Sequence, residues 1–340
     1  MGKIINDRWE IVSSLGEGGQ GRTFTVREVG GSADSLFVLK QLKNPARVRR
    51  LHNEIESISR LSHPATVRLI DSNIDVDRPY LVTEYCAGGN LAVARPFWRD
   101  SAVAALTLFE HVLEGIAYAH RQGVVHRDVK PENIFLRTPS GPPVIGDFGL
   151  AYLEESDERH TETTEAVGPR LYMAPELEDG RLENVSSAAD IYSLGKLLYW
   201  LLAGRVFSRE KHRQSQWDIK NAYKDPMSEG GDPFLEHINF LLDLMVVEDP
   251  TQRRTAENLL ILTRQVRHLI STRAHPLTLS IRHPCSFCGR GDYVVRVDGD
   301  TLALQNLGIG AVGGNRWRVL SCDRCGHVQL FNTFNSEPWK

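Results

Sequence analysis

The stretch from 126 to 149 carries side chains whose types and spacing suit chemistry on phosphate. It reads HRDVKPENIFLRTPSGPPVIGDFG and holds Asp128, Asn133 five residues later, and Asp147 beyond an apolar run. Carboxylate and amide oxygens are hard ligands of the kind that Mg²⁺ prefers. Transfer of a phosphoryl group from ATP needs such ligands, in-line positioning and a group that orients the attacking hydroxyl. The spacing therefore indicates phosphoryl transfer, in which Asp128 accepts the hydroxyl proton while Asn133 and Asp147 supply oxygens to the metal.

Two further features make this interpretation specific. Lys130, two residues after Asp128, can neutralise charge that develops on the transferred group. The run H-R-D-x-K-P-E-N is followed in order by DFG and by Ala174-Pro175-Glu176. A single tripeptide of this kind would carry little weight, but the ordered set resembles the catalytic loop and metal-binding motif of the eukaryotic-type serine/threonine protein kinases, in a bacterial-like form.

The resemblance implies an α+β fold with two lobes. The expected kinase domain covers residues 1–270, with a small β-rich lobe at 1–84 and a large helical lobe at 87–270. A linker at 271–284 and a small β zinc-ribbon domain at 285–340 would follow. The chain has 340 residues and 41% apolar content, which is enough for one large core and a small appended domain.

A glycine turn between two short strands is expected near the N-terminus. Gly16, Gly18 and Gly21 fit the pattern G-x-G-x-x-G between the runs IVSSL and RTFTV. No helical pattern follows, which disfavours a dinucleotide-binding fold, because that motif needs its glycines to open a helix. A strand–turn–strand can instead close backbone N–H groups over phosphates, and the resemblance implies this role here.

Lys40 ends the β-type run SLFVLKQ and matches the family's lysine that binds the α- and β-phosphates. Apolar residues then recur at helical spacing, at Leu51, Ile55, Ile58 and Leu61. Glu54 lies on this apolar side of the expected helix, whereas Glu56 lies on the polar side. We therefore expect Glu54 to pair with Lys40 and Glu56 to be solvated.

The run PYLVTEYCAGGNL at 79–91 predicts a strand that continues into the hinge between the lobes. The resemblance implies that the backbone of Glu84 and Cys86 binds the adenine edge, so that their side chains matter little. Asn90 would contact the ribose. Cys86 is then a hinge residue and no metal ligand.

The segment from 150 to 176 is polar and rich in threonine, which is typical of an activation segment. Arg127, beside the catalytic aspartate, could pair with a phosphate on this segment and order it. The candidate acceptors are Thr161, Thr163 and Thr164. The alternative is a solvated loop without phosphate. Pro169 stands where the family usually has threonine, which leaves open how well the chain binds substrate and how active it is.

Two later features complete the kinase resemblance. The run SAADIYSLGKLLYWLLA at 187–203 is apolar nearly all round and predicts a buried central helix. Asp190 at its start would accept backbone N–H bonds from the catalytic loop, as its family counterpart does. Arg253 matches the late arginine that pairs with the glutamate of the APE motif, here Glu176.

Two Cys-x-x-Cys pairs, each followed by glycine, lie in the tail, with 33 residues between Cys288 and Cys322. Their cysteines are Cys285, Cys288, Cys322 and Cys325. If hairpins bring the pairs together, the four thiolates form a closed tetrahedral site, which favours structural Zn²⁺ over redox thiols or iron. β-type runs between the pairs strengthen the resemblance to a zinc ribbon. So small a domain would depend on its metal for folding.

Composition excludes few classes. The formal net charge of −3 gives no signal for nucleic acid or an anionic membrane. The tail from 282 to 340 has seven Arg and Lys and five Asp and Glu, so a protein partner is favoured over nucleic acid. The N-terminal residues lack the apolar core of a secretion signal, and we expect a cytoplasmic protein without a membrane span.

The predicted function is a serine/threonine protein kinase that uses ATP with Mg²⁺ or Mn²⁺ and phosphorylates proteins, itself included. One alternative is a catalytically weak nucleotide-binding scaffold that acts through the ribbon. Another is a small-molecule kinase of the aminoglycoside type, which is disfavoured because such enzymes lack the peptide platform that carries the APE motif.

Overall fold

The structure is a computed structural model that describes residues 3–18, 21–44, 48–94, 96–148, 171–178, 186–207, 219, 223, 235–272, 283–284, 292–299, 317–322, 324 and 328–332. The chain divides into two compact units. The first comprises Met1–Val206 and Leu244–Leu260, and the second comprises Phe207–Asp243 and Ile261–Lys340. The first unit contains every residue predicted to act on phosphate, and the second contains the four cysteines of the predicted ribbon.

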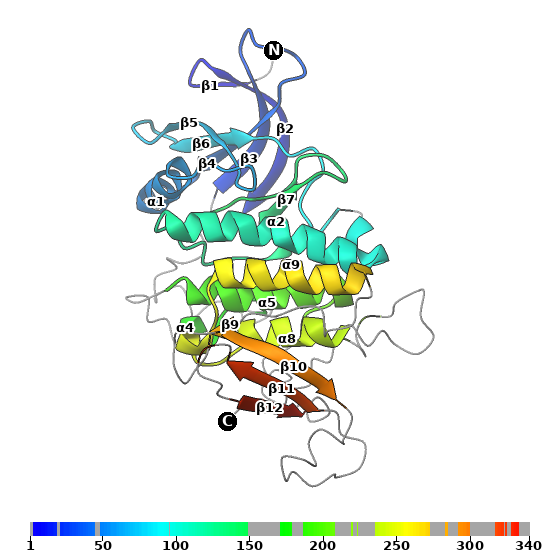
Figure 1. Ribbon diagram of the computed structural model, residues 1–340. Helices are drawn as coiled ribbons and strands as arrows, with labels where there is room; N and C mark the ends of the chain where they lie inside the picture. Colours follow the sequence, from blue (N-terminus) through cyan, green and yellow to red (C-terminus); the bar gives the residue numbers. More distant parts are fainter. Residues whose placement is uncertain are drawn as a thin grey trace. The chain divides into compact units, whose positions relative to one another are not determined.

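A six-stranded antiparallel sheet opens the first unit, with strand order β1-β2-β3-β4-β6-β5 (Figure 1). Its strands are β1 (Ile4–Ile5), β2 (Trp9–Gly18), β3 (Gly21–Glu28), β4 (Phe37–Leu42), β5 (Leu69–Asn73) and β6 (Tyr80–Glu84). The predicted strand–glycine turn–strand is confirmed, since Gly18 pairs with Gly21 where β2 meets β3. A Cβ on Gly21 would overlap the backbone oxygen of Gln41, so this position requires glycine.

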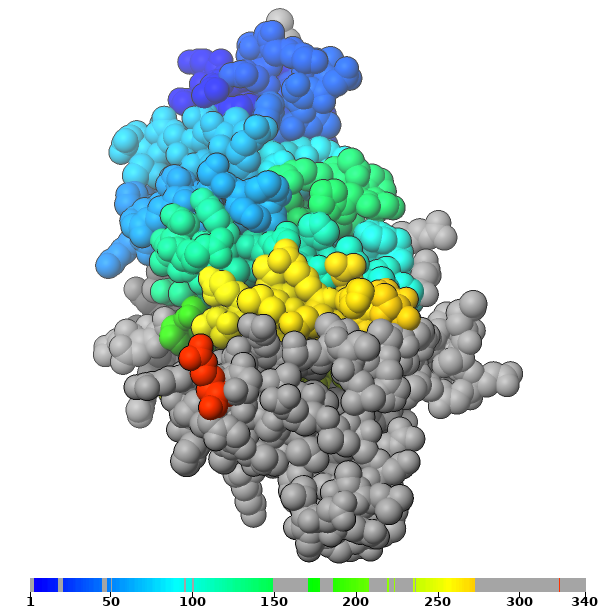
Figure 2. Space-filling model, viewed as in Figure 1, coloured from blue at the N-terminus to red at the C-terminus, as the bar shows by residue number. Residues whose placement is uncertain are grey.

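The two faces of this sheet bury different apolar sets. One face forms a core around Trp9, whose ring lies edge-on to Phe37 with the centroids 5.3 Å apart. On the other face, Leu42 and Leu81 pack with Leu51 of helix α1 (Val48–Ser59), which contacts β5 and β6. In Figure 2 the residues of the sheet and of α1, coloured blue to cyan, lie together in one part of the surface. The helix is thereby held beside the strand that carries Lys40.

The helical part is built around α2 (Ala102–Arg121) and α5 (Ala188–Ala203), which contact each other. The other elements are η2 (Phe97–Asp100), η3 (Pro131–Asn133), β7 (Ile134–Leu136), β8 (Pro143–Ile145), α4 (Pro175–Glu178), α8 (Glu236–Met245), η6 (Pro250–Gln252) and α9 (Ala256–Thr272). Ser101 caps α2 by accepting a bond from the Ala104 N–H at 3.0 Å. Helix α2 is long and apolar enough to cross a membrane, but 67% of its most apolar window is buried, as in a core helix.

Helix α5 is buried nearly all round, as its sequence predicted, and this includes a lysine. Lys196 is only 2% exposed, and its Nζ lies 5.5 Å from the centroid of the Tyr192 ring. Burial lowers the pKa of Lys196 to about 8, although the charge of Glu248 works in the opposite direction. The lysine therefore binds its proton less readily in the folded protein than in the unfolded chain.

We expect this lysine to make stability depend on pH. Burial of the charged lysine lowers the free energy of unfolding, because its pKa is lower in the folded protein than in the unfolded chain. This loss of stability is complete below about pH 8 and disappears as pH rises above the unfolded pKa near 10.4. Between pH 7.5 and 10, the free energy of unfolding of the wild type should rise by about 2 kcal/mol relative to Lys196→Met. Urea titrations of both proteins at the two pH values measure this difference. A difference that stays constant with pH would contradict it.

The second unit contains a four-stranded antiparallel sheet of order β12-β11-β10-β9. Its strands are β9 (His283–Pro284), β10 (Asp292–Gly299), β11 (Trp317–Cys322) and β12 (Val328–Asn332). Strands β10 and β11 contain the predicted β-type runs YVVRV and WRVL. Three of the four predicted ligands, Cys285, Cys288 and Cys325, lie outside the described residues, whereas the backbone of Cys322 ends β11.

Candidate active site

Asp128 lies at the centre of a tight polar cluster in the catalytic loop. The Nζ of Lys130 is 2.6 Å from Asp128 Oδ2. The side-chain amide of Asn133 donates to the same Oδ2 and to the Asp128 backbone oxygen, both at 2.8 Å. These bonds fix the orientation of the carboxylate and leave Asn133 Oδ1 as an acceptor, as a metal ligand requires. The structure thus brings together three of the four residues predicted to be catalytic.

The fourth, Asp147, meets Lys40 and Glu54 in a second cluster. Lys40 Nζ on β4 lies 2.7 Å from Asp147 Oδ1 and 3.5 Å from Glu54 Oε1 on α1. The expected pair of Lys40 with Glu54 is therefore present, and Lys40 also bridges to Asp147. Glu56 lies elsewhere, with its side chain 49% exposed and paired to Arg60, which follows the last residue of α1. Helical periodicity alone therefore distinguished the inward glutamate from the outward one.

The electrostatics of this second cluster favour charged Lys40 and Asp147. Burial disfavours both charges, but the two carboxylates raise the pKa of Lys40, and Lys40 in turn lowers the pKa of Asp147. Burial raises the pKa of Glu54 to about 8, because this residue is only 2% exposed. Lys40, the cation that pairs with Glu54, also pairs with Asp147 and therefore offsets this effect only in part. Asp147 is therefore the ionised carboxylate of the pair, which suits a metal ligand.

Asp190 on α5 holds the catalytic loop in place through hydrogen bonds. Its fully buried carboxylate accepts the backbone N–H groups of His126 at 2.8 Å and Arg127 at 2.7 Å. The ring of His120 contributes a third contact, with Nε2 2.8 Å from Asp190 Oδ2. Burial opposes ionisation, but these contacts lower the pKa of Asp190 below its ordinary value. The sequence predicted that Asp190 accepts backbone N–H bonds from this loop, whereas the contact with His120 was not predicted.

The backbone is unusual at two residues beside the reacting groups. Arg127 has a φ of 69° and Asp147 has a φ of 61°, and residues other than glycine rarely adopt this backbone region. Buried His126 supports both segments, since its Nε2 lies 2.9 Å from Gly146 O and its ring packs 4.6 Å from that of Phe148. His126 is thus a packed structural residue that holds these two strained segments together.

The APE glutamate is held by the predicted late arginine. Arg253 Nη1 lies 2.6 Å from Glu176 Oε1, and Nη2 donates to Oε2 at 2.8 Å. The same guanidinium donates to backbone oxygens of Ala188, Val247 and Glu248. A bidentate pair with additional backbone bonds anchors α4 firmly against α5.

The family model for the protein kinase domain matches residues 9–262. The chain belongs to the protein kinase family. Serine/threonine-protein kinase Pkn1 of Myxococcus xanthus is 35% identical over 206 residues, which cover 58% of this chain and 29% of Pkn1. Aurora/IPL1-related protein kinase 2 of Caenorhabditis elegans is 32% identical over 267 residues, covering 75% of this chain and 82% of that protein. The chain therefore spans less than a third of Pkn1 but most of the Aurora-related kinase.

A solved structure supports the fold. The kinase domain of Mycobacterium tuberculosis PknI superposes with a TM-score of 0.55 at 24% identity, covering 78% of this chain and 97% of that domain. At this identity the match shows the fold alone. The relatives with similar sequences include bacterial proteins named serine/threonine-protein kinases, among them Pkn1 and a probable kinase of Corynebacterium efficiens.

The residues expected to contact the nucleotide lie on the β2–β3 hairpin, on β4 and in the hinge. Gly16, Gly18 and Gly21 lie on the β2–β3 hairpin, and Thr23 of β3 pairs directly with Lys40 of β4. Gly88, in the predicted hinge, donates its N–H to Leu136 O at 2.9 Å. A backbone hydrogen bond therefore joins the hinge to β7 of the helical lobe.

Three residues in or beside the hinge have distinct surroundings. Cys86 is 8% exposed, and burial raises the pKa of its thiol to about 11, so it is a packed, unreactive residue. Asn90 Oδ1 accepts the Val93 N–H at 3.2 Å, so its side chain caps a turn beside the expected ribose position. Glu84 makes side-chain contacts that the resemblance did not imply, because its carboxylate accepts two bonds of 2.9 Å from Arg137, and the adenine contact of its backbone stays a prediction.

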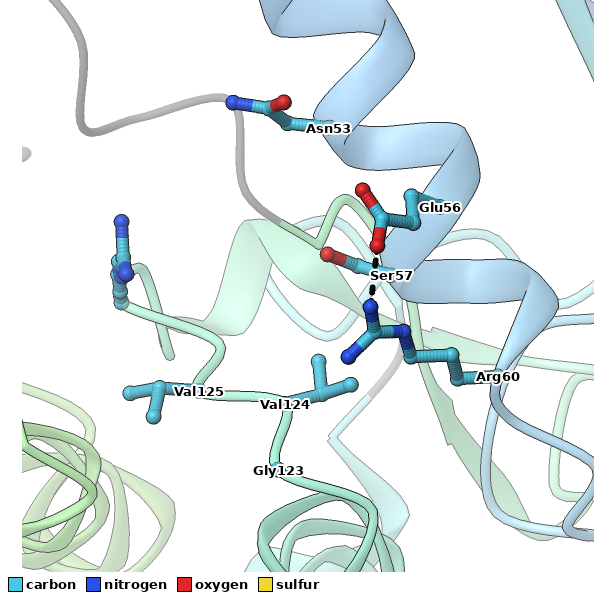
Figure 3. Close-up of a pocket in the computed structure, with 8 residues that line it drawn as sticks. Asn53, Glu56, Ser57, Arg60, Gly123, Val124 and Val125 are labelled. Atoms are coloured by element: carbon cyan, nitrogen blue, oxygen red, sulfur yellow. Dashed lines mark hydrogen bonds and ion pairs between the residues drawn. The ribbon is translucent and has the colours of Figure 1, made fainter.

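A small polar cavity lies between α1 and the start of the catalytic loop (Figure 3). It has a volume of about 230 Å³ and is lined by Asn53, Glu56, Ser57, Arg60, Gly123, Val124, Val125 and Arg127. Figure 3 shows the side chains of Glu56 and Arg60 pointing toward each other on the side of the cavity where α1 lies. The residue expected to receive a phosphate, Arg127, thus faces a polar space. The threonines of the activation segment and Pro169 lie outside the described residues.

Proposed function

We propose that this chain transfers the γ-phosphate of ATP to serine and threonine hydroxyls of proteins, with autophosphorylation among its reactions. The observation that carries this proposal is the pair of clusters around Asp128 and Asp147. One cluster holds a carboxylate between a cation and an amide. The other joins a strand, a helix and the DFG aspartate through Lys40.

The residues divide the work as follows. Asp128 orients the substrate hydroxyl and takes its proton as the oxygen bonds to the γ-phosphorus and the bond to the β–γ bridging oxygen breaks. Lys130 neutralises charge on the moving group, and Lys40 holds the α- and β-phosphates. Asn133 and Asp147 would hold Mg²⁺ or Mn²⁺, which neutralises charge on the phosphates when bound. The glycine hairpin and the hinge backbone would position the nucleotide.

Mapping of phosphosites after incubation with ATP and Mg²⁺ tests this function. We expect phosphoserine and phosphothreonine on the wild type, and none on Asp128→Ala. Label on Thr161, Thr163 or Thr164 would support regulation through Arg127. A protein that binds ATP yet acquires no label would instead favour the scaffold alternative.

The tail is proposed to be a zinc ribbon, on the strength of its strand register. Pro284, just before the first cysteine pair, lies opposite Asp292, while Tyr293 lies opposite Cys322. The β9–β10 connection, which contains the first pair, therefore leaves the sheet at the same end as Cys322 and the β11–β12 connection, which contains Cys325. Four thiolates at one end suit a closed tetrahedral Zn²⁺ site. We also propose a protein partner for the ribbon and a cytoplasmic location, because a reducing compartment keeps such thiols available for metal.

Metal analysis tests the ribbon. We expect about one zinc ion per chain in the wild type and loss of that zinc in Cys285→Ser, because three thiolates bind far more weakly than four. Cys86→Ser is the matched control, since Cys86 lies in the hinge of the other unit, and it should retain zinc. Wild-type protein that contains iron, or no metal, would contradict the assignment.

A further inference from the structure

Arg137, which follows β7, makes an ion pair that crosses from one lobe to the other. Its Nε lies 2.9 Å from Glu84 Oε2, and its Nη2 lies 2.9 Å from Glu84 Oε1. Glu84 is the last residue of β6, immediately before the hinge. A bidentate pair of this kind fixes both the distance and the relative orientation of its partners.

The same arginine binds a second segment of the N-terminal lobe. Nη1 donates to Pro64 O at 2.5 Å and Nη2 to Thr66 O at 3.5 Å, both in the connection between α1 and β5. Its own backbone oxygen accepts the N–H of Ala87 in the hinge at 3.1 Å. One residue of the helical lobe therefore contacts the end of β6, the hinge and the connection after α1.

Glu84 is also held from the N-terminal side. Its Oε1 accepts the backbone N–H of Arg68 at 2.9 Å, and its own N–H donates to Arg68 O at 3.1 Å. Burial works to raise the pKa of Glu84, but the bonds from Arg137 and Arg68 outweigh it and lower that pKa. The side chains are 15% exposed for Glu84 and 32% for Arg137, so solvent screens the pair less than a surface ion pair.

We propose that Arg137 is a positioning residue that restrains opening of the two lobes at the hinge and thereby slows release of nucleotide. Separation of β6 from β7 on this side requires the two Glu84 bonds and the two backbone bonds to stretch together. Residues 85–90 connect the lobes here, and they border the expected adenine position. The inference rests on the proposed binding of ATP between the lobes.

Dissociation of a fluorescent ADP analogue, followed by stopped-flow chase with unlabelled ATP, tests this. Arg137→Gln should raise the dissociation rate constant about tenfold, the size expected for losing a charge-assisted bond. Arg137→Lys, which retains one charge-assisted contact, should give an intermediate value. Glu84→Gln should also raise the rate, and the double variant should be no faster than the faster single variant, because both changes break one contact.

Arg27→Gln is the matched control. It removes another arginine–glutamate pair of the N-terminal lobe, Arg27 Nε to Glu10 Oε2 at 2.8 Å, which joins β2 to β3 and does not cross between the lobes. We expect its rate constant to match the wild type. Folded Arg137→Gln with a wild-type rate and only a lower melting temperature would show that the pair is merely structural and would overturn the inference. Wild-type protein that binds no nucleotide would overturn the proposed function itself.

Discussion

Replacement of Asp128 by asparagine is expected to lower kcat by about a thousandfold, the range of effect for loss of a positioned general base. Asparagine has nearly the same shape and retains an oxygen that Lys130 and Asn133 can contact at the position of Oδ2. It cannot accept the hydroxyl proton, however. The nucleotide affinity and the melting temperature should therefore stay close to those of the wild type. Steady-state transfer of labelled phosphate and a nucleotide titration measure the two quantities.

Asp77→Asn provides the control for this change. Asp77 is exposed, and it lies on the connection between β5 and β6, away from both clusters. It should leave kcat unchanged. Full activity in Asp128→Asn would remove Asp128 from the role of base, whereas a large loss of ATP affinity would show that the residue acts on nucleotide binding instead.

Replacement of Asp190 by alanine is expected to reduce both stability and activity. The change leaves two buried backbone N–H groups and the His120 ring without their shared acceptor. Buried donors that lose their partner cost about 1–3 kcal/mol each, so the free energy of unfolding should fall by about 3 kcal/mol. Because Arg127 needs these bonds to hold its positive φ, the catalytic loop should relax and kcat should fall about a hundredfold.

Urea unfolding and initial-rate measurements under stabilising conditions separate the two effects. Asp34→Ala, in an exposed turn before β4, should change neither quantity. His120→Asn removes one contact and leaves both backbone bonds, so it should lie between the wild type and Asp190→Ala. A stable and fully active Asp190→Ala protein would mean that the loop keeps its shape without this carboxylate.

Local sequence was sufficient for the residues that act on phosphate. Asp128, Lys130 and Asn133 lie within six positions, so a single loop and one 3-10 turn bring them together. The choice of Glu54 over Glu56 needed only helical periodicity, since one side chain is buried against the sheet and the other is half exposed. In both cases the spacing along the chain determines the spacing in the fold.

Contacts over long sequence separations were not predictable in the same way. His120 and Asp190 are 70 residues apart, and a histidine in the last turn of a helix carries no sign of a particular partner. Arg137 and Glu84 are 53 residues apart, and the hinge motif directs attention to the Glu84 backbone rather than its carboxylate. Such pairs depend on how α2, α5, β6 and β7 pack, which a single sequence does not specify.

A crystal structure with Mg²⁺ and a non-hydrolysable ATP analogue tests the central claim most directly. We predict metal ions on Asn133 Oδ1 and Asp147, the α- and β-phosphates on Lys40, and the γ-phosphate beneath the β2–β3 hairpin within reach of Asp128. A nucleotide bound elsewhere, or phosphates remote from Asp128 with no metal on Asp147, would contradict the account.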